Sequence, residues 1–313
     1  MSPQLPAPGE HGGDGALLAR ALGLRPEEIL DLSATLNPLA PDVTAVVRKE
    51  AAVTARYPEA SAATGSLADA IGVARERLLL TNGGAEAISL VAAEMAPLRV
   101  VEPEFSLWRR HLGPAGLSPD PSRRVRSNPN NPTGLLAGLR EKALVWDEAF
   151  YQLTTGCWTR GDADEGSTVV GSLTKLFACP GLRLGYALCP DGEVRERLAA
   201  RQPAWSVNGL ALAVLPHLLA AARLGEWREE LASLREELVG LLTTAGLEVA
   251  AGTAPWVLVH RAGFLRPALA RHGVLVRDCS SFGLPDTVRL AVPGPAGMRR
   301  LANALAACLE DSR

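Results

Sequence analysis

Lys175 lies in the mostly apolar stretch GSLTKLFACPGLRLGYALCP, residues 171–190, and this position suggests nucleophilic chemistry. The chain has only three lysines, at positions 49, 142 and 175. Partial burial disfavours the charged ammonium form of a lysine, and the neutral amine is a nucleophile. The stretch also places Ser172 three residues before Lys175 and Arg183 eight residues after it. These observations single out Lys175 as a candidate catalytic residue.

Three further segments carry patterns that chemistry could use. TNGGAEAI, residues 81–88, has glycines ahead of a predicted helix, where free N–H groups and the helix dipole can bind an anion, although such turns are more often structural. SNPNNPTG, residues 127–134, predicts a rigid, turn-rich loop. In VWDEAF, residues 145–150, Asp147 follows a predicted buried strand, although an acid at a strand end is more often a helix cap or a surface residue. The sequence has no Walker-type Gly-Lys pair and no GxGxxG after a strand.

The elements that must position these residues alternate between strands and helices. Strands are predicted within residues 77–84, 99–104, 123–134, 143–150, 167–175 and 182–189. Helices are predicted over residues 16–23, 43–56 and 85–96 and through most of 205–245. This order predicts an α/β fold with a largely parallel sheet. The polar residues follow strand ends, which is where open α/β sheets bind ligands.

At 313 residues the chain exceeds a typical single core, so more than one domain is expected. We predict an N-terminal arm and substrate-site segment over residues 1–42, a large domain over 43–220 and a smaller α+β domain over 221–313. The first 15 residues are rich in proline and glycine and lack the pattern of a signal peptide.

Composition narrows the classes of function. The net charge of −2, with acids and bases mixed along the chain, argues against nucleic acid or an anionic membrane as the main partner. The five cysteines and five histidines show no metal-ligand spacing, so no metal site is predicted. The cysteines are typical of isolated thiols in a reducing cytoplasm. No apolar run is long enough to span a bilayer.

The motifs NNPTG, DEAF and SLTK…GLRLGY resemble, in this order, the signatures of fold-type I pyridoxal phosphate (PLP) enzymes. The similarity extends over nearly the whole chain. It is greatest to the branch that contains histidinol-phosphate aminotransferases and threonine-phosphate decarboxylases. The resemblance implies the PLP-dependent transferase (aspartate aminotransferase-like) fold, with PLP as cofactor.

The resemblance also implies roles in catalysis and cofactor binding. Lys175 would form the Schiff base with PLP, and Asp147 would pair with the ring nitrogen and keep it protonated. Asn131 would donate to the ring hydroxyl oxygen, and Phe105 would stack on the ring, although composition alone makes Phe105 typical of a core residue. Tyr57 corresponds to a tyrosine that reaches the cofactor phosphate of the neighbouring subunit, which implies a homodimer. A tyrosine packed before a proline is the alternative reading.

Four groups from the segments 81–88 and 171–190 would hold the phosphate of PLP. These are the backbone N–H groups of Gly84 and Ala85 and the side chains of Ser172 and Arg183, which would make charge-assisted hydrogen bonds.

Several details resemble the decarboxylase branch in particular. They are the His-Gly-Gly of the N-terminal arm, the AWSVN segment at residues 204–208 and the Arg-x-Cys of VRDCSSF at residues 276–282. Phe150 stands where many of the aminotransferases carry a tyrosine. We therefore expect a lyase that decarboxylates L-threonine O-3-phosphate to an aminopropanol phosphate in cobalamin biosynthesis. The alternatives are an aminotransferase for histidinol phosphate or another amino acid, and a degenerate PLP fold that serves as a binding module.

A phosphorylated amino acid needs two anion sites. Arg289 resembles the family arginine for the α-carboxylate, and a plain surface-strand arginine is the alternative. Candidates for the substrate phosphate and its surroundings are Arg277, His11, Thr35 and Asn37. The relatives tend to have Asn where this chain has Asp14 and Thr35. A related amino acid is therefore an alternative substrate.

Overall fold

The computed structural model describes residues 5–310, and within them the chain forms two compact units. The first unit comprises the residues up to Pro38, Pro132–Gly134, and the residues from Glu229 onward. The second unit comprises Leu39–Asn131 and Leu135–Arg228. Residues 1–4 of the predicted arm lie outside the described part of the chain. The domain bounds at 42 and 220 stay a prediction.

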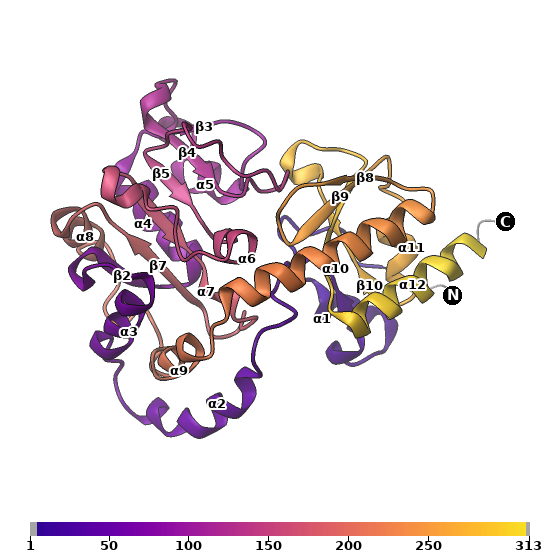
Figure 1. Cartoon of the computed structure of the whole chain (residues 1–313), viewed down its shortest axis with the longest axis horizontal. Helices are drawn as coiled ribbons and strands as arrows, with labels where there is room; N and C mark the ends of the chain where they lie inside the picture. The colour runs from indigo at the N-terminus through magenta and orange to yellow at the C-terminus, as the bar shows by residue number, and fades with distance from the viewer. Residues whose placement is uncertain (1–4, 311–313) are drawn as a thin grey trace. The chain divides into compact units, whose positions relative to one another are not determined.

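The second unit is built on one six-stranded sheet of order β2-β7-β6-β5-β4-β3 (Figure 1). Its strands are β2 (Leu78–Asn82), β3 (Arg99–Val100), β4 (Arg124–Ser127), β5 (Val145–Asp147), β6 (Thr168–Gly171) and β7 (Leu184–Leu188). Strands β3 to β6 pair in parallel, whereas β7 pairs antiparallel with both β6 and β2. The predicted largely parallel sheet is confirmed, with β7 as its reversed strand.

Eight α-helices surround this sheet or connect its strands. They are α2 (Val43–Glu50), α3 (Ser61–Ile71), α4 (Gly83–Met95), α5 (Ser106–Leu112), α6 (Tyr151–Thr155), α7 (Leu173–Leu176), α8 (Gly192–Ala199) and α9 (Gly209–Ala220). Helix α4 packs on β2, β6 and β7, and α5 packs on α4. Their apolar faces meet the sheet in a core that contains Val91, Trp108, Val125 and Val145. This core fixes the strand ends where the candidate chemistry lies.

The first unit holds a four-stranded antiparallel sheet of order β11-β12-β9-β8 and a parallel pair, β1 with β10. The strands are β1 (Leu30–Asp31), β8 (Glu248–Ala251), β9 (Trp256–His260), β10 (Val274–Leu275), β11 (Arg277–Asp278) and β12 (Thr287–Ala291). The helices are α1 (Gly15–Leu22), α11 (Leu265–Ala270) and α12 (Pro295–Glu310), and α10 (Leu224–Thr244) contains the boundary between the units. Helix α1 ends where Gly23 takes up φ 69°, a left-handed conformation that favours glycine.

Most elements lie where the sequence predicts them, but α3, α5, α6 and α8 were not predicted, and α7 occupies the end of a segment that was predicted as strand. Helix α3 consists mainly of small residues, SAATGSLADAI, and buries only Ala63, Leu67 and Ala68. Such a helix shows little of the apolar periodicity on which a sequence-based prediction depends.

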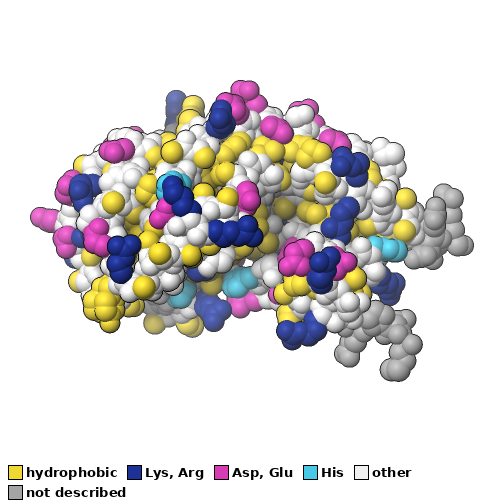
Figure 2. All heavy atoms as spheres, turned by 90° about the horizontal axis from the view of Figure 1, so that it is seen from below, with side chains coloured by type: hydrophobic (Ala, Val, Ile, Leu, Met, Phe, Trp, Pro, Cys, Tyr) yellow, Lys and Arg dark blue, Asp and Glu magenta, His cyan; other side chains and the backbone are white. Residues whose placement is uncertain are grey.

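No single helix within residues 5–310 has the length and apolar character needed to cross a membrane, although α9 and α10, bent by 83°, meet those limits together. On the face drawn in Figure 2, acidic and basic side chains are interspersed.

Candidate active site

The predicted cofactor residues follow strand ends at one edge of the sheet in the second unit. Strands β2, β4, β5 and β6 run in the same direction, so their carboxyl ends share that edge. Strand β7 runs the opposite way, so the same edge receives its first residue, next to Arg183. The four loops noted in the sequence therefore come together because of the strand directions.

Two glycines at the start of α4 lie against the groups predicted to hold a phosphate. A Cβ added to Gly83 would lie 2.3 Å from an Nη atom of Arg183. A Cβ added to Gly84 would lie 3.4 Å from the Cβ of Ser172 and 3.8 Å from its Oγ. The start of α4 also carries the positive end of the helix dipole. Backbone N–H groups, a hydroxyl and a guanidinium thus converge at one helix terminus, which is chemistry suited to a phosphate.

The backbone at Arg183 and Gly185 lets β7 lie close to the start of α4. Arg183 has φ 56°, which is uncommon for a residue with a side chain. A Cβ on Gly185 would lie 2.4 Å from the carbonyl carbon of Gly83 and 2.5 Å from the Gly84 nitrogen. Only glycine at position 185 lets β7 approach the start of α4 this closely.

Asp147, at the end of β5, is 4% exposed and has two hydrogen-bond donors. The indole Nε1 of Trp108 donates to its Oδ2 at 3.1 Å, and the Ala149 backbone N–H donates to its Oδ1 at 3.2 Å. Burial raises the pKa of Asp147 to about 6, against the opposing effect of these two hydrogen bonds. A buried carboxylate of this kind gains stability from a cationic partner, such as a protonated ring nitrogen.

Asn131 lies in the loop that follows β4, which is the strand next to β5. Its backbone N–H donates to the Ser127 Oγ at 2.9 Å. Ser127 and Asp147 are register partners across the two strands, and the Asn128 N–H donates to the Asp147 carbonyl at 2.8 Å. Asn131 and Asp147 are therefore held by adjacent strand ends, as two contacts to one ring would require.

The remaining predicted cofactor residues occupy different settings. Lys175 is half-buried in α7, and its backbone N–H donates to the Ser172 carbonyl at 3.4 Å. Phe105 directly precedes α5 and packs against the core. Tyr57 is 79% exposed, and its ring lies 4.7 Å from that of Trp205. No interaction described within residues 5–310 joins Tyr57 to the other predicted cofactor residues.

These observations test whether PLP fits the second unit. The helix start brings together groups suited to a phosphate, and the buried Asp147 carboxylate offers a partner for a cationic ring nitrogen. Lys175 lies on the short helix α7, which directly follows Ser172 and β6, the strand next to β5. The residues present thus fit the chemical groups of PLP.

The first unit brings together two of the predicted substrate residues. Arg277 on β11 and Arg289 on β12 are register partners and are 4% and 6% exposed. The Arg289 guanidinium carbon lies 5.2 Å from the Trp256 ring centre, and that of Arg277 lies 5.5 Å from the Phe282 ring centre. Burial lowers the pKa of both arginines, that of Arg289 to about 10. Two adjacent buried cations form an environment that favours anions.

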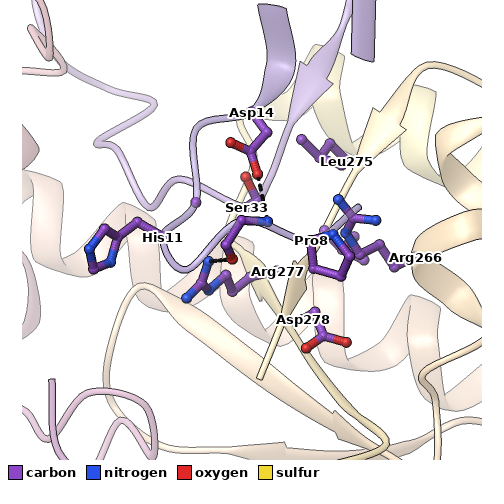
Figure 3. A pocket seen from close by; sticks show the side chains of 11 residues that line it. Pro8, His11, Asp14, Ser33, Arg266, Leu275, Arg277 and Asp278 are labelled. Atoms are coloured by element: carbon purple, nitrogen blue, oxygen red, sulfur yellow. Dashed lines mark hydrogen bonds between the residues drawn. The ribbon is translucent and has the colours of Figure 1, made fainter. Parts of the chain in front are cut away.

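His11 and Arg277 also line one pocket of the first unit, with a volume of about 10 Å³ (Figure 3). The Arg277 Nη1 donates to the Gly9 carbonyl at 2.9 Å, and its Nη2 donates to the Glu10 carbonyl. Asp14 lines the same pocket and accepts a hydrogen bond from the Gly9 N–H at 3.2 Å. The Asp14 carboxylate thus stabilises the turn of the arm that contains Gly9.

Thr35 and Asn37 are buried but do not line this pocket. The Thr35 hydroxyl oxygen has no hydrogen-bond partner among the described residues.

Several residues near the candidate site carry no signal in the motifs noted above. Trp108 contacts Asp147 through its indole nitrogen, and Glu104 accepts hydrogen bonds from Ser127. Gly185, by contrast, could have been identified within the GLRLGY motif, because a glycine inside a strand often marks a close backbone approach. Arg266 lines the pocket beside Arg277, and its Nη1 donates to the Pro6 carbonyl at 3.0 Å.

Comparison with known proteins identifies the family. A sequence model for aminotransferase class I and II matches residues 125–305. The threonine-phosphate decarboxylase of Salmonella typhimurium (strain LT2) is 30% identical, covering 94% of this chain and 95% of the relative. The histidinol-phosphate aminotransferase of Halobacterium salinarum is also 30% identical, covering 88% of this chain and 89% of the relative.

A solved structure shows the same fold. The histidinol-phosphate aminotransferase of Sinorhizobium meliloti in complex with pyridoxal-5′-phosphate matches with a TM-score of 0.81, over 99% of this chain and 96% of that chain. Its sequence identity is 18%, so this likeness establishes the fold alone. The family match and the similarity to its members along nearly the whole chain lead to one conclusion: the chain belongs to the aminotransferase class I and II family of pyridoxal 5′-phosphate-dependent enzymes.

Proposed function

We propose that this enzyme decarboxylates L-threonine O-3-phosphate to an aminopropanol phosphate, a reaction of cobalamin biosynthesis. The proposal is supported by the similarity to threonine-phosphate decarboxylases and by the arrangement of the first unit. An aminotransferase that acts on histidinol phosphate is the second candidate, because such enzymes are equally similar in sequence.

The observation that carries the proposal is a convergence in the first unit. The His-Gly-Gly segment of the arm and the Arg-x-Cys segment at Arg277 both resemble the decarboxylase branch. They are more than 260 residues apart in the sequence, yet His11, Gly12 and Arg277 line the same pocket. Segments that resemble one branch therefore contribute to one local structure, which supports a shared role for them.

The substrate of this reaction carries a carboxylate and a phosphate. Arg289 would bind the α-carboxylate and Arg277 the phosphate, with His11, Thr35 and Asn37 as further candidate ligands. The two guanidinium groups are buried and are neighbours across a strand pair. Low exposure strengthens each charge-assisted hydrogen bond, and a planar guanidinium can grip either group with two parallel bonds. To bind a phosphate, Arg277 would have to exchange its present hydrogen bonds to the carbonyls of the arm for bonds to the phosphate oxygens.

In the second unit, bound PLP supplies a ring that takes up the electron pair left when a bond to the substrate Cα breaks. Gly84, Ala85, Ser172 and Arg183 would hold its phosphate. Asp147 would keep the proton on the ring nitrogen.

Three further side chains would complete the cofactor site. Asn131 would orient the ring through its hydroxyl oxygen, and Phe105 would cover one face. The Lys175 amine would attach the cofactor and later deliver a proton to the carbon that has lost CO₂.

The aminotransferase alternative requires a second substrate. A transaminase consumes a 2-oxo acid such as 2-oxoglutarate, whose carboxylates would also suit an arginine pair. Decarboxylation needs no amino-group acceptor. The requirement for an oxo acid therefore separates the two reactions, whichever residues bind the substrate.

The test supplies the PLP-loaded enzyme with carboxyl-labelled L-threonine O-3-phosphate in the absence of any oxo acid. We expect labelled CO₂ over many turnovers, with an aminopropanol phosphate in equal amount. Unphosphorylated L-threonine serves as the control for the phosphate site and should react at least about a hundredfold more slowly, because it lacks the phosphate that would make charge-assisted hydrogen bonds to Arg277. The Lys175→Ala variant serves as the blank.

A parallel reaction contains histidinol phosphate and 2-oxoglutarate. Glutamate formation there, with no labelled CO₂ in the first reaction, would assign the enzyme to the aminotransferases. Absence of both products would point to a changed substrate, as Asp14 and Thr35 suggest, because the relatives tend to have Asn at these positions.

We also propose that the enzyme is a cytoplasmic homodimer. The exposed Tyr57 beside Trp205 supports a subunit contact at this place, since large exposed aromatic groups are typical of interfaces. The cysteines support the cytoplasmic location, since no disulfide joins any of the five within residues 5–310.

A further inference from the structure

Glu104 is a buried acid beside the cofactor site that no family motif accounts for. It lies between Pro103 and Phe105 in the loop that connects β3 to α5, and it is 2% exposed. An ionised carboxylate is rarely kept in such a position without several donors. Three donors are present: the Ser127 N–H at 2.9 Å, the Ser127 hydroxyl, and the Phe105 N–H at 2.8 Å.

The hydrogen bonds of Glu104 continue to Asn131. The Ser127 hydroxyl donates its proton to Glu104 Oε1, so its oxygen is available to accept the Asn131 backbone N–H at 2.9 Å. The Asn130 side chain adds a second tie to the same loop, since its Nδ2 donates to the Pro103 carbonyl at 3.0 Å. One carboxylate thus fixes the backbone of Phe105 directly and that of Asn131 through a single hydroxyl.

The charge of Glu104 acts on the same region. Burial raises the pKa of Glu104 to about 7, the hydrogen bonds from Ser127 and Phe105 oppose this rise, and the negative charge of Asp147 adds to it. The Asp147 charge therefore acts on Glu104, and Ser127, the register partner of Asp147, lies between them along the network.

We propose that Glu104 is a positioning residue for the cofactor ring, because it sets Phe105 and, through Ser127, Asn131. The inference rests on the proposed ring contacts of Phe105 and Asn131. It does not depend on the choice between decarboxylation and transamination. Without Glu104, the loop after β4 loses the acceptor that orients the Ser127 hydroxyl, and the Asn131 amide is free to move away from the ring oxygen.

The test compares three variants with a matched control. Glu104→Gln retains size but places an amide NH₂ against a backbone N–H, so at least one of the three hydrogen bonds is lost. Ser127→Ala interrupts the path to Asn131 and leaves a smaller perturbation of the fold, and Asn131→Ala removes the proposed ring contact itself. Glu76→Gln is the control, because it makes the same chemical change on an exposed side chain of the same unit.

Two measurements are made on each protein: the PLP dissociation constant by titration of the apoprotein, and the pH midpoint of the absorbance change of bound PLP. We expect Glu104→Gln and Ser127→Ala to weaken PLP binding roughly tenfold, as loss of one buried hydrogen bond would. We also expect Ser127→Ala to raise the absorbance midpoint by about 0.5 pH units or more, in the direction of Asn131→Ala. The Asn131 donor withdraws negative charge from the ring oxygen, so its displacement lets bound PLP keep a proton to higher pH.

The outcomes separate this inference from the proposed roles on which it rests. If Asn131→Ala shifts the midpoint but Ser127→Ala and Glu104→Gln behave like Glu76→Gln, the positioning role is wrong and the Asn131 contact stands. If Asn131→Ala itself has no effect, both are wrong. A lower melting temperature of the apoprotein with unchanged affinity and midpoint would make Glu104 structural only and would also overturn the proposal.

Discussion

At the scale of single residues, the buried Asp147 carboxylate offers the sharpest test of the cofactor site. It is 4% exposed, and its neighbours Trp108 and Ala149 donate hydrogen bonds without supplying a positive charge. We predict that Asp147→Asn leaves PLP bound but lowers kcat roughly a hundredfold or more, since a neutral amide cannot keep the ring nitrogen protonated. Rapid-mixing kinetics of the PLP-loaded variant would measure the loss.

A control addresses the hydrogen bond alone. Trp108→Phe removes the indole donor to Asp147 but keeps the carboxylate and most of the ring volume. Trp108→Phe should lower kcat far less than Asp147→Asn does. A near-normal rate for Asp147→Asn would show that another group protonates the ring nitrogen.

At the scale of elements, the close approach of β7 to the start of α4 shapes the proposed phosphate site. A methyl group at position 185 would lie 2.5 Å from the Gly84 nitrogen, and backbone cannot move aside as a side-chain tip can. We predict that Gly185→Ala costs about 1–3 kcal/mol of apoprotein stability and weakens PLP binding at least about tenfold. Thermal unfolding and PLP titration would measure the two effects.

Gly181→Ala is the matched control for this prediction. Gly181 precedes the same strand, and an added Cβ there would meet no atom within 4 Å. Equal stability and PLP affinity in the two variants would mean that the helix start is not the phosphate site, or that β7 shifts at little cost.

At the scale of the whole molecule, the exposed Tyr57 bears on whether the active enzyme is a dimer with shared sites. If the partner subunit's Tyr57 reaches the cofactor phosphate, Tyr57→Phe should weaken PLP binding several-fold, by about the worth of one hydrogen bond. Mixed with Lys175→Ala, it should then regain activity at limiting PLP, because one site of each mixed dimer is intact. Activity of the mixture above the sum of the separate variants is the measurement.

Tyr151→Phe provides the comparison, because it makes the same change at a half-buried tyrosine on α6. It should bind PLP normally. Sedimentation of the wild-type enzyme as a monomer, or a mixture no more active than its parts, would contradict the shared site.

Much of this protein is determined by local sequence. The alternation of strands and helices, the glycine turn before α4 and the motifs around Asp147 and Lys175 are short segments, so they could be interpreted without knowing the partners. They predicted the fold class, the family and the cofactor. Helix α3 was missed because its small residues give little apolar periodicity.

Other features depend on residues that meet only after folding. The contacts of Glu104 with Ser127 span 23 residues, and that of Trp108 with Asp147 spans 39. The sequence around Glu104, which follows a proline, does not indicate its partner. The same holds for Trp108, which lies in a short helix. The burial that raises the pKa of Glu104 and Asp147 likewise belongs to the packed sheet edge. Local patterns named the groups that do chemistry, whereas the direction of each strand decided which of them share an edge, because hydrogen-bonded pairing between distant segments is set by the whole sheet.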